Sequence, residues 1–405
     1  MLVDGVLAEL TRGVVDLHER AELEERLVAG KPLRVKAGFD PTRPDLHLGH
    51  TVLMQKMRQF QDAGHQVVFV VGDFTAMVGD PTGRSDARPR LTREEVLASA
   101  ETYKAQAFKI LDEARTEVRY NSEWLAGLPL DQVISLASRR TVARTLERRD
   151  FRERFEQSRD IYLHELLYPL LQGYDSVALD ADLELGGTDQ LFNLMVGRDL
   201  MRSYGKRPQL VMTVPILEGL DARLQDGKVV GKKMSKSANN AIGLTEPPLE
   251  MFRKVMQIDD GVIWRFYELL SSRSAEDVAK IREENNPLSA KRTFAEEIIT
   301  RYHDASAASE ARREFEATYL KDGIPDQIDE LSLATEGAGL ALSKALSDAG
   351  LVKSTSEGRR LIEQGGVEVD HQRVTDVRHQ LTRGQRYLLR VGSKKRRFAY
   401  VTVLP

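Results

Sequence analysis

The 405-residue chain contains no cysteine, which excludes disulfide bonds and metal sites built from thiolates. It has no apolar run long enough to cross a bilayer. Its start carries Asp4 and Glu9 where a secretory signal peptide has a basic cluster. The net charge of −3 gives no overall signal for nucleic-acid binding. These absences favour a soluble cytoplasmic protein of about two to four domains with no membrane partner.

Three common ligand-binding signatures are missing or incomplete. Gly227 to Lys233 has the outline of a phosphate-binding Walker loop, but three residues separate its glycines and no Ser or Thr follows its lysine. His164 and Glu165 begin like a zinc-protease helix, but the second histidine is absent. The Gly-x-Gly-x-x-Gly segment of dinucleotide-binding proteins is also absent. We expect neither a metal site nor a bound prosthetic group.

Residues 33–71 have the pattern of a β-α-β unit. Residues 33–39 are predicted to form a strand, and residues 67–71 are a continuous apolar run, typical of a buried parallel strand. Between them, apolar residues at helical spacing predict a helix over 51–63, which Gly64 ends. The unit predicts an α/β fold with a doubly wound sheet.

Further elements are predicted along the rest of the chain. We expect helix over 4–29, a helical insertion over about 120–165, sheet again at 177–179, a Gly-Gly turn at 186–187, a helix through Tyr204, a strand over 210–214, helices over 247–320, a linker over 322–336, short helices over 342–349 and 356–364, and short strands over 367–369, 387–390 and 398–403. The predicted domains are a catalytic domain over 1–240, an α-helical domain over 241–320, a linker over 321–338 and a small domain over 339–405.

The predicted insertion is rich in arginine, with Arg139, Arg140, Arg144, Arg148, Arg149, Arg152 and Arg154. Acidic residues such as Glu147 and Glu153 alternate with them, as on a solvated helical face. Contact with RNA or with another subunit is an equally good interpretation of these arginines.

Two short segments carry most of the chemistry. In His47-Leu48-Gly49-His50, two imidazoles stand three residues apart where a helix begins. There they can donate to phosphate oxygens with help from the helix dipole, and Gly49 allows the backbone close to a nucleotide. In Lys233-Met234-Ser235-Lys236-Ser237, two lysines can neutralise a leaving pyrophosphate while the small serines hydrogen-bond nearby.

In this order the two segments resemble the signatures of class I aminoacyl-tRNA synthetases. Further segments resemble those of bacterial tyrosyl-tRNA synthetases, so that the resemblance covers essentially the whole chain. They are Gly38-Phe39-Asp40-Pro41-Thr42, Gly79-Asp80-Pro81-Thr82-Gly83, the run from Tyr168 to Asp175, and Gly186-Gly187-Thr188-Asp189-Gln190. The resemblance implies a Rossmann-like catalytic domain with a helical insertion, an α-helical domain that meets the anticodon region of tRNA, and a C-terminal S4-like α+β RNA-binding domain.

The resemblance also implies the reaction and the partners. Tyrosine is activated by ATP to tyrosyl-adenylate and pyrophosphate, and the tyrosyl group is then transferred to the 3′ end of tRNA(Tyr). ATP is a substrate that comes with Mg²⁺. The implied partners are L-tyrosine, ATP, tRNA(Tyr) and a second copy of the chain in a homodimer, with no DNA and no membrane.

Matching positions imply a role for each site residue. The implied catalytic residues are His47, His50, Lys233, Lys236, Thr42 and Arg84. The implied ATP-binding residues are Gly49, Thr51, Asp189, Met234, Ser235 and Ser237. The implied tyrosine-binding residues are Asp40, Asp80, Tyr168, Gln172, Asp175 and Gln190. Taken singly, Asp175 is better read as a turn residue, Asp189 equally as a charge at a helix start, and Tyr168 as part of the core.

Four positions depart from the family pattern. Many members have a tyrosine that hydrogen-bonds the substrate phenol at the position of Lys36. Arg84 stands where a lysine is frequent and keeps the charge, Glu184 stands where a glutamine is common, and Asp73 adds a carboxylate. A site that selects tyrosine needs a polar partner for the phenol hydroxyl, since a buried unpaired hydroxyl is costly. By similarity Asp175 is that partner.

Positive charge is concentrated at the end of the chain. Residues 341–405 contain 13 Lys and Arg against 6 Asp and Glu, a net charge of +7. Because the whole chain has a net charge of −3, residues 1–340 have a net charge of −10. Such concentration is typical of a nucleic-acid-binding module. The patterned apolar residues argue against a merely solubilising tail, and the segment 341–369 resembles the S4 RNA-binding fold.

Two alternatives to a tyrosine enzyme remain at this point. A tryptophanyl-tRNA synthetase shares the fold, but the set Tyr168, Gln172 and Asp175 and the S4-like tail favour tyrosine. A catalytically silent RNA-binding paralogue is opposed by the intact histidines and lysines of the two signatures.

Removal of the residues from about Ala341 onward is expected to leave tyrosine-dependent pyrophosphate exchange intact and to cripple the charging of tRNA. The reason is that the +7 charge lies in a module separated from the predicted ATP site. Both activities are measured on the full and shortened chains. Normal charging by the shortened chain would show that the module is not the RNA contact.

Overall fold

A computed structural model describes residues 2–41, 45–82, 91–319, 328–335, 339–370, 372–392 and 397–404. Contacts divide the chain into two units, Met1–Asp304 and Ala305–Pro405. Each unit is described by itself. None of the helices in the described parts of the chain combines the length and the apolar character needed to cross a membrane.

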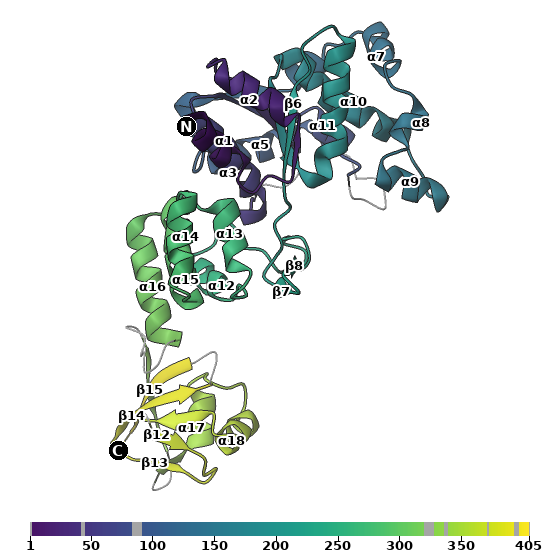
Figure 1. The fold of residues 1–405 in the computed structure, drawn as a ribbon. Helices are drawn as coiled ribbons and strands as arrows, with labels where there is room; N and C mark the ends of the chain where they lie inside the picture. The colour runs from purple at the N-terminus through teal and green to yellow at the C-terminus, as the bar shows by residue number, and fades with distance from the viewer. Residues whose placement is uncertain are drawn as a thin grey trace. The chain divides into compact units, whose positions relative to one another are not determined.

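The first unit is built on a six-stranded sheet of order β1-β6-β5-β2-β3-β4 (Figure 1). Every neighbouring pair is parallel except β1 with β6. The strands are β1 Asp16–His18, β2 Arg34–Phe39, β3 Gln66–Val71, β4 Thr116–Tyr120, β5 Leu183–Gly187 and β6 Leu210–Val214. The order runs outward in both directions from β2, so the predicted doubly wound α/β sheet is confirmed.

Helices cover both faces of this sheet, with α3 on one face and α10 and α11 on the other (Figure 1). The helices of the first unit are α1 Leu2–Thr11, α2 Arg20–Val28, α3 Leu48–Asp62, α4 Thr75–Val78, α5 Arg93–Ala107, α6 Ser122–Leu125, α7 Leu130–Ala137, α8 Val142–Thr145, α9 Arg149–Glu156, α10 Leu163–Leu179, α11 Leu191–Ser203, α12 Pro248–Met256, α13 Ile263–Leu270, α14 Ala275–Glu283 and α15 Pro287–Tyr302, with short 3-10 turns η1 Glu113–Arg115 and η2 Thr188–Gln190. A small hairpin, β7 Arg223–Gln225 and β8 Lys228–Val230, precedes the lysine loop.

The central β-α-β unit forms as its pattern predicts. Both faces of β3 are covered, so residues 67–71 are all buried. Helix α3 starts after His47, whose ring accepts a bond from the backbone of Gly49, and its end is followed by Gly64 at a φ of +88°. That positive φ is one that glycine adopts without strain.

Two predicted elements of this unit are wrong. Residues 177–179 end the long helix α10, and the strand of this region is β5, four residues further on. An apolar run on a helix packed against both a sheet and a second helix has no polar face to distinguish it from a buried strand. Residues 4–29 are not one helix, because β1 pairs with β6 between α1 and α2.

Strands β2 and β5 pair over only two rungs, Val35 with Leu183 and Lys36 with Glu184. Beyond this point they separate, although each continues to pair with its other neighbour, β3 or β6. The chain order reverses between these two strands, and ligands bind at such switch points in open α/β sheets, outside the carboxyl ends of the strands.

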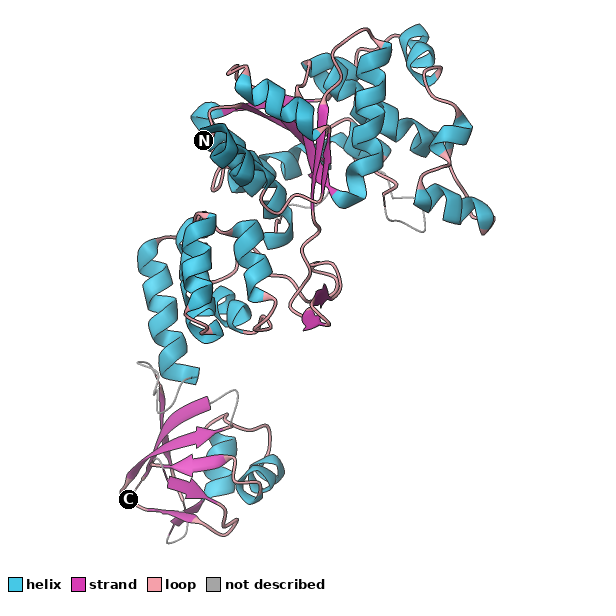
Figure 2. Cartoon of the chain, in the orientation of Figure 1, coloured by secondary structure: helices cyan, strands magenta, loops and turns pink. Residues whose placement is uncertain are grey.

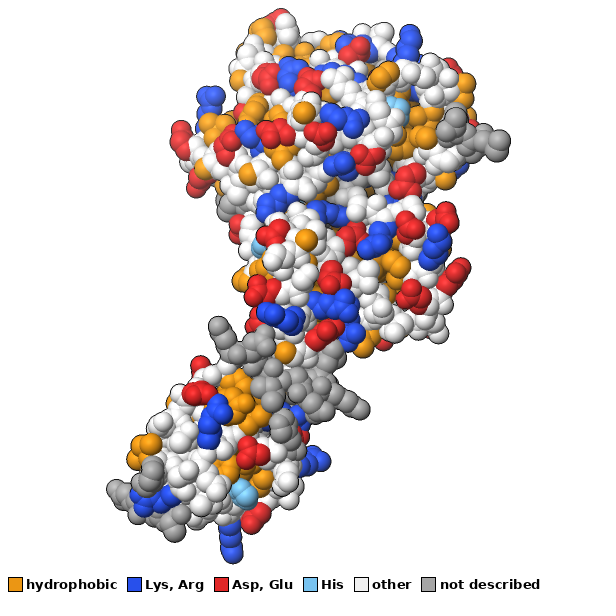
Figure 3. All heavy atoms as spheres, turned by 90° about the vertical axis from the view of Figure 1, so that its left-hand side faces the viewer, with side chains coloured by type: hydrophobic (Ala, Val, Ile, Leu, Met, Phe, Trp, Pro, Cys, Tyr) orange, Lys and Arg blue, Asp and Glu red, His pale blue; other side chains and the backbone are white. Residues whose placement is uncertain are grey.

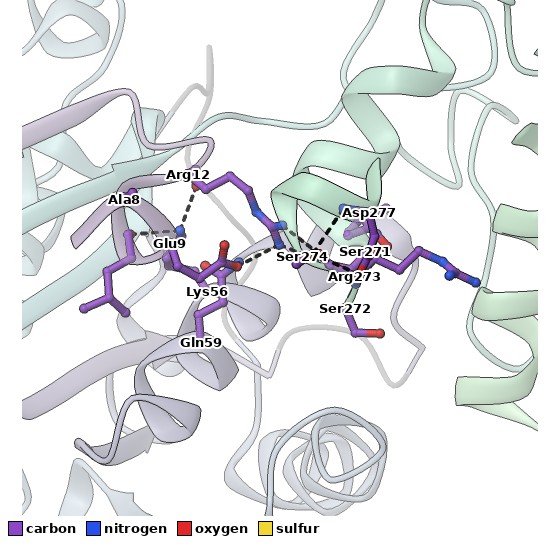
Figure 4. A network of polar contacts seen from close by, with 12 residues as sticks. Ala8, Glu9, Arg12, Lys56, Gln59, Ser271, Ser272, Arg273, Ser274 and Asp277 are labelled. Atoms are coloured by element: carbon purple, nitrogen blue, oxygen red, sulfur yellow. Dashed lines mark hydrogen bonds and ion pairs between the residues drawn. The ribbon is translucent and has the colours of Figure 1, made fainter. Parts of the chain in front are cut away.

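A buried lysine of α3 and Arg12, just after α1, tie the end of α1 to α3 and to the segment that follows α13 (Figure 4). Lys56 of α3 donates to the backbone oxygens of Leu10 (3.0 Å) and Arg12 (2.7 Å) at the end of α1. The Arg12 side chain in turn donates to the backbone oxygens of Arg273 (2.8 Å) and Ser271 (3.3 Å). Two of these acceptors, Leu10 and Ser271, lie at the ends of α1 and α13, where backbone carbonyls have no partner within their own helix.

The second unit begins with α16 Ala305–Tyr319 and contains a five-stranded sheet with two helices (Figure 2). The sheet order is β12-β11-β14-β15-β9, and β10 pairs separately with β13. The elements are β9 Asp329–Leu333, β10 Gly339–Ala341, α17 Leu342–Asp348, α18 Thr355–Glu363, β11 Val367–Val369, β12 Gln372–Val374, β13 Gln380–Thr382, β14 Arg386–Val391 and β15 Arg397–Val403. The predicted pair of helices and the three predicted strands are therefore confirmed.

The predicted linker over 322–336 is wrong where it is described. Residues 329–333 form β9, which pairs in parallel with β15 and so belongs to the sheet of the second unit. Its residues alternate polar and apolar over a short stretch rich in acids, which hides the strand in the sequence. A shortened chain that removes the whole sheet of this unit must therefore end before Asp329.

Lys56→Met is expected to lower the free energy of unfolding by about 1–3 kcal/mol, because it leaves the two carbonyl oxygens at the end of α1 without a donor while keeping the apolar stem. Urea unfolding followed by circular dichroism measures the change. The control is Lys31→Met, at an exposed position. Equal stability of the two variants would mean that the Lys56 bonds do not stabilise the fold.

Candidate active site

The candidate site lies where β2 and β5 separate, and it consists of two adjoining cavities. The larger has about 410 Å³ and the smaller about 170 Å³. Both are lined by Phe39, Leu53 and Gly187, so they meet along a common wall. The smaller lies below the size of about 300–1,000 Å³ typical for drug-sized ligands, which suits a small molecule such as an amino acid.

The two histidines of the first signature line the larger cavity with their rings 3.9 Å apart. The Nδ1 atom of His47 accepts from the backbone N–H of Gly49, and the Nδ1 atom of His50 accepts from the backbone N–H of His47, both at 3.2 Å. Because Nδ1 is the acceptor in each ring, the proton of the neutral ring is on Nε2. Each ring therefore has a donor left for a ligand.

Burial keeps both histidines neutral. Desolvation, followed by the charges of His50 and the two signature lysines, lowers the pKa of His47 to about 3. Desolvation likewise lowers the pKa of His50 to about 4, against a backbone hydrogen bond that raises it. At neutral pH the pair can donate hydrogen bonds to phosphate without adding positive charge, which is left to the lysines.

The lysines of the second signature hold carboxylates at the mouth of the same cavity. Lys233 pairs with Asp189 at 3.2 Å and Lys236 with Asp45 at 2.8 Å. All four side chains line the cavity together with Ser235 and Ser237, whose hydroxyls lie 3.4 Å apart. Both ion pairs are partly exposed, so a polyphosphate can replace the carboxylates as the partner of the lysines at little cost.

The lysine loop is fixed by a residue that the sequence did not single out. The side chain of Asn240, which is buried, accepts from the backbone N–H of Ser235 (2.8 Å) and donates to Asp221 (2.6 Å) and to the backbone oxygen of Lys233 (3.3 Å). A Cβ on Gly219 would come within 2.1 Å of the Asn240 amide. The sequence signal that could have revealed this residue is the asparagine pair Asn239-Asn240, which follows the lysine loop after Ala238.

The remaining predicted ATP-binding residues divide into two groups. Gly49 and Met234 line the larger cavity, and a Cβ on Gly49 would lie 3.0 Å from the His47 ring. Thr51 does not line it, because this side chain is fully buried and donates to the backbone oxygen of Leu48 at 2.8 Å. The aromatic wall comes from Tyr103, which the sequence analysis missed.

The six predicted tyrosine ligands all line the smaller cavity: Asp40, Asp80, Tyr168, Gln172, Asp175 and Gln190. The Tyr168 hydroxyl donates to Asp40 at 2.9 Å, and burial, then the charges of Asp40 and Asp80, raise the pKa of this phenol well above its usual value. Gln172 presents a buried amide oxygen for which the described residues supply no hydrogen-bond donor. The cavity therefore offers carboxylates and a neutral acceptor to an ammonium group.

Asp175 is buried, with 3% of its surface exposed, and lines this cavity. It accepts from Trp124 Nε1 at 2.8 Å and from Asn121 Nδ2 at 3.4 Å. Burial raises the pKa of Asp175 to about 7, although the charge of Lys36 and these two donors lower it. Asn121 directly follows β4, at the carboxyl edge of the sheet where polar residues from parallel strands converge. Its position after a strand could have identified Asn121 as a site residue from the sequence.

Asp80 and Gln190 are held by an arginine from the insertion. Gln190 donates to Asp80 at 2.8 Å and accepts from Asn193 at 2.8 Å. Arg148, only 6% exposed, donates to Asn193 (3.1 Å) and to Thr82, and lies 3.7 Å from Asp80. The description of the insertion as a solvated face is therefore wrong for Arg148.

Several other residues named from the sequence are placed away from both cavities or are not placed. Asp73 accepts from the backbone and hydroxyl of Ser122 at 2.9 and 2.6 Å and does not line the smaller cavity. Thr42 and Arg84 lie outside the described residues. Within the described residues, no group of three or more His, Asp or Glu side chains is arranged to hold a metal ion.

The sequence matches two family profiles. Residues 29–319 match the family described as tRNA synthetases class I (W and Y), and residues 342–386 match the S4 domain. A tyrosine–tRNA ligase of Coxiella burnetii is 51% identical over 400 residues, which are 98% of this chain and 98% of the relative. One of Geobacter sulfurreducens is 51% identical over 411 residues, 99% of this chain and 100% of the relative.

Solved structures share the fold at low sequence identity. A C-terminally truncated mitochondrial tyrosyl-tRNA synthetase of Coccidioides posadasii matches with a TM-score of 0.62 and 20% identity, over 76% of this chain and 91% of that one. A tyrosyl-tRNA synthetase of Archaeoglobus fulgidus, complexed with L-tyrosine, matches with a TM-score of 0.59 and 23% identity, over 77% and 100%.

Lys233→Ala and Lys236→Ala are each expected to slow ATP-dependent activation of the amino acid by about ten- to a hundredfold, the value of one charge-assisted hydrogen bond. Binding of the amino acid alone should change little, because neither lysine lines the smaller cavity. Single-turnover kinetics and equilibrium binding measure the two effects.

The matched control is Lys232→Ala. This lysine is exposed, adjacent in sequence and absent from the cavity lining. Equal rates in all three variants would contradict the role given to the loop.

Proposed function

The chain belongs to the tyrosine–tRNA ligases within the class I tRNA synthetases, and we propose that its two adjoining cavities bind ATP and tyrosine side by side for adenylation. The observation that carries this proposal is the common wall of the two cavities, with neutral histidines and lysines on one side and buried acceptors on the other. This wall would bring a carboxylate in the smaller cavity next to the α-phosphate of a nucleotide in the larger one.

In the proposed first step a carboxylate oxygen of tyrosine attacks the α-phosphorus of ATP. The new bond joins that oxygen to phosphorus, and the bond from the α-phosphorus to the bridging oxygen breaks to release pyrophosphate. Charge grows on the phosphate oxygens, so the catalyst is mostly fixed donors and cations. His47 and His50 supply neutral Nε2–H donors, and Lys233 and Lys236 exchange their carboxylate partners for the phosphates.

We assign the nucleoside and the amino acid to the remaining groups. Asp189, released from Lys233, would accept from the ribose, and Gly49 would let the backbone lie against the nucleoside. In the smaller cavity, Asp80 and the unpaired oxygen of Gln172 would receive the ammonium, and Asp175 would accept from the phenol hydroxyl. Loss of such an acceptor penalises the hydroxylated substrate more than phenylalanine.

For the second step we propose that the 3′ end of tRNA(Tyr) enters along the insertion. A third cavity, of about 760 Å³, shares Asp189 and Ile216 with the nucleotide cavity. Its lining includes the exposed Arg149 and Arg159 as well as acidic residues such as Glu147. These two arginines would pair with the phosphate backbone.

We propose that the second unit binds tRNA through its S4 domain. Among the described residues of the S4 domain, 342–386, eight basic side chains are exposed: Lys344, Lys353, Arg359, Arg360, Arg373, Arg378, Arg383 and Arg386. Figure 3 shows Lys and Arg side chains on one face of this unit. We further propose that the helices following residue 240 meet the anticodon region.

A homodimer is supported by large apolar side chains left exposed on the insertion. Leu130 and Ile134 of α7, Val142 of α8, Phe155 of α9 and Leu163 at the start of α10 all face solvent. An interface with a second copy would bury these exposed apolar side chains. We also propose that Mg²⁺ enters with ATP, held mainly by phosphate oxygens and water, and that the protein works in the cytoplasm, where its substrates are found.

Exchange of pyrophosphate into ATP tests this function. The wild-type chain is expected to catalyse exchange with tyrosine at least about a thousandfold better than with phenylalanine, because the polar ring end discriminates by the absent hydroxyl, and His50→Ala should lose most of that rate. Preference for tryptophan in this exchange would instead indicate a tryptophanyl-tRNA synthetase. Absence of exchange with every amino acid would make it an RNA-binding protein without this activity.

A further inference from the structure

A fully buried ion pair lies at the base of the split between β2 and β5. Lys36 and Glu184 are both 1% exposed, and their charged atoms are 3.0 Å apart. They face each other on the last rung over which the two strands pair. The pair therefore marks the point at which the sheet opens into the smaller cavity.

Both members of the pair contact α10, the helix that carries three of the proposed tyrosine ligands: Tyr168, Gln172 and Asp175. Lys36 donates to the backbone oxygen of Gln172 at 3.4 Å. Glu184 accepts from Ser176 at 3.1 Å and from Gln209, and lies 3.5 Å from the Gln172 amide nitrogen. Buried ion pairs are usually no more stabilising than well-packed apolar residues. The fold alone therefore gives little reason for charge at this position.

Asp175 lies on the same face of α10, three residues after Gln172 and one before Ser176. The titratable groups that face it are Lys36 from β2, Glu184 from β5 and Tyr168 from its own helix. Lys36 lowers the pKa of this carboxyl and Glu184 raises it. The two members of the pair therefore act on the same carboxyl with opposite signs.

We infer that Lys36 and Glu184 are a specificity-determining positioning pair for Asp175. Lys36 favours the ionised form of Asp175, which accepts from the phenol hydroxyl of tyrosine, and Glu184 anchors the Lys36 ammonium and opposes its effect. This inference rests on the proposed function of the site. Lys36 does not touch the substrate, since it does not line the cavity. It acts through the charge of Asp175, because a carboxylate accepts a stronger hydrogen bond than a neutral carboxyl. A second direct hydroxyl ligand is then unnecessary.

The test is the ratio of kcat/KM for tyrosine to that for phenylalanine in pyrophosphate exchange, measured from pH 5.5 to 9. Phenylalanine has no hydroxyl, so the ratio isolates the ring end. In the wild type the ratio should rise with pH through the titration of Asp175, near pH 7. Lys36→Met should move this midpoint up by about one pH unit or more, since it removes the opposite charge.

Glu184→Gln should move the same midpoint down, since it removes a like charge. Because glutamine is nearly isosteric with glutamate, this variant should fold. If Lys36→Met does not fold, the direction of the midpoint shift in Glu184→Gln alone tests the inference. The control is Arg26→Met, which removes another buried cation, paired with Glu22 and Asp182, and should leave the midpoint unchanged.

A purely structural role would lower tyrosine binding in both variants without opposite shifts. An unmoved midpoint, or midpoints displaced in one direction, would overturn the inference while the wild type still activates tyrosine. Failure of the wild type to activate tyrosine at any pH would instead overturn the proposed function.

Discussion

The separation of β2 from β5 is the constraint on which the rest of the site depends. Two parallel strands that stayed paired to their ends would fill the space with backbone hydrogen bonds. Here pairing stops after Lys36 and Glu184, while β3 and β6 hold the outer edges of the two strands. The gap is thus made by the order of the strands rather than by any loop. The start of α3, the lysine loop and the proposed ligands on α10 all line the two cavities at this gap.

Within this gap the two cavities have opposite electrostatic character. The larger cavity, proposed for the nucleotide, has lysines that are partly exposed and histidines kept neutral by burial. The smaller cavity, proposed for the amino acid, has carboxylates that accept from neutral donors such as Trp124, Asn121 and Gln190. This division fits the roles in catalysis and in selection that are proposed for the two cavities.

Local patterns predicted the central β-α-β unit and both signatures, because those segments depend on their own residues. The predictions failed where tertiary contacts decide. Val177 and Leu179 are apolar because they are buried against neighbouring elements, and β9 forms only because β15 offers it an edge. The predicted tyrosine ligands do meet in one cavity, but the residues that hold them, Arg148 and Asn121, come from distant segments. No local pattern joins an arginine of the insertion to Asp80.

The parallel pairing of β9 with β15 has a consequence for the second unit when it is separated from the chain. An S4 module cut at Gly339 would keep both helices and most of its core but would lose β9. Strand β15, with its alternating buried residues, would then become an unprotected edge of seven residues. Open edges of this kind recruit strands from other molecules. The short acidic strand therefore also guards the module against self-association.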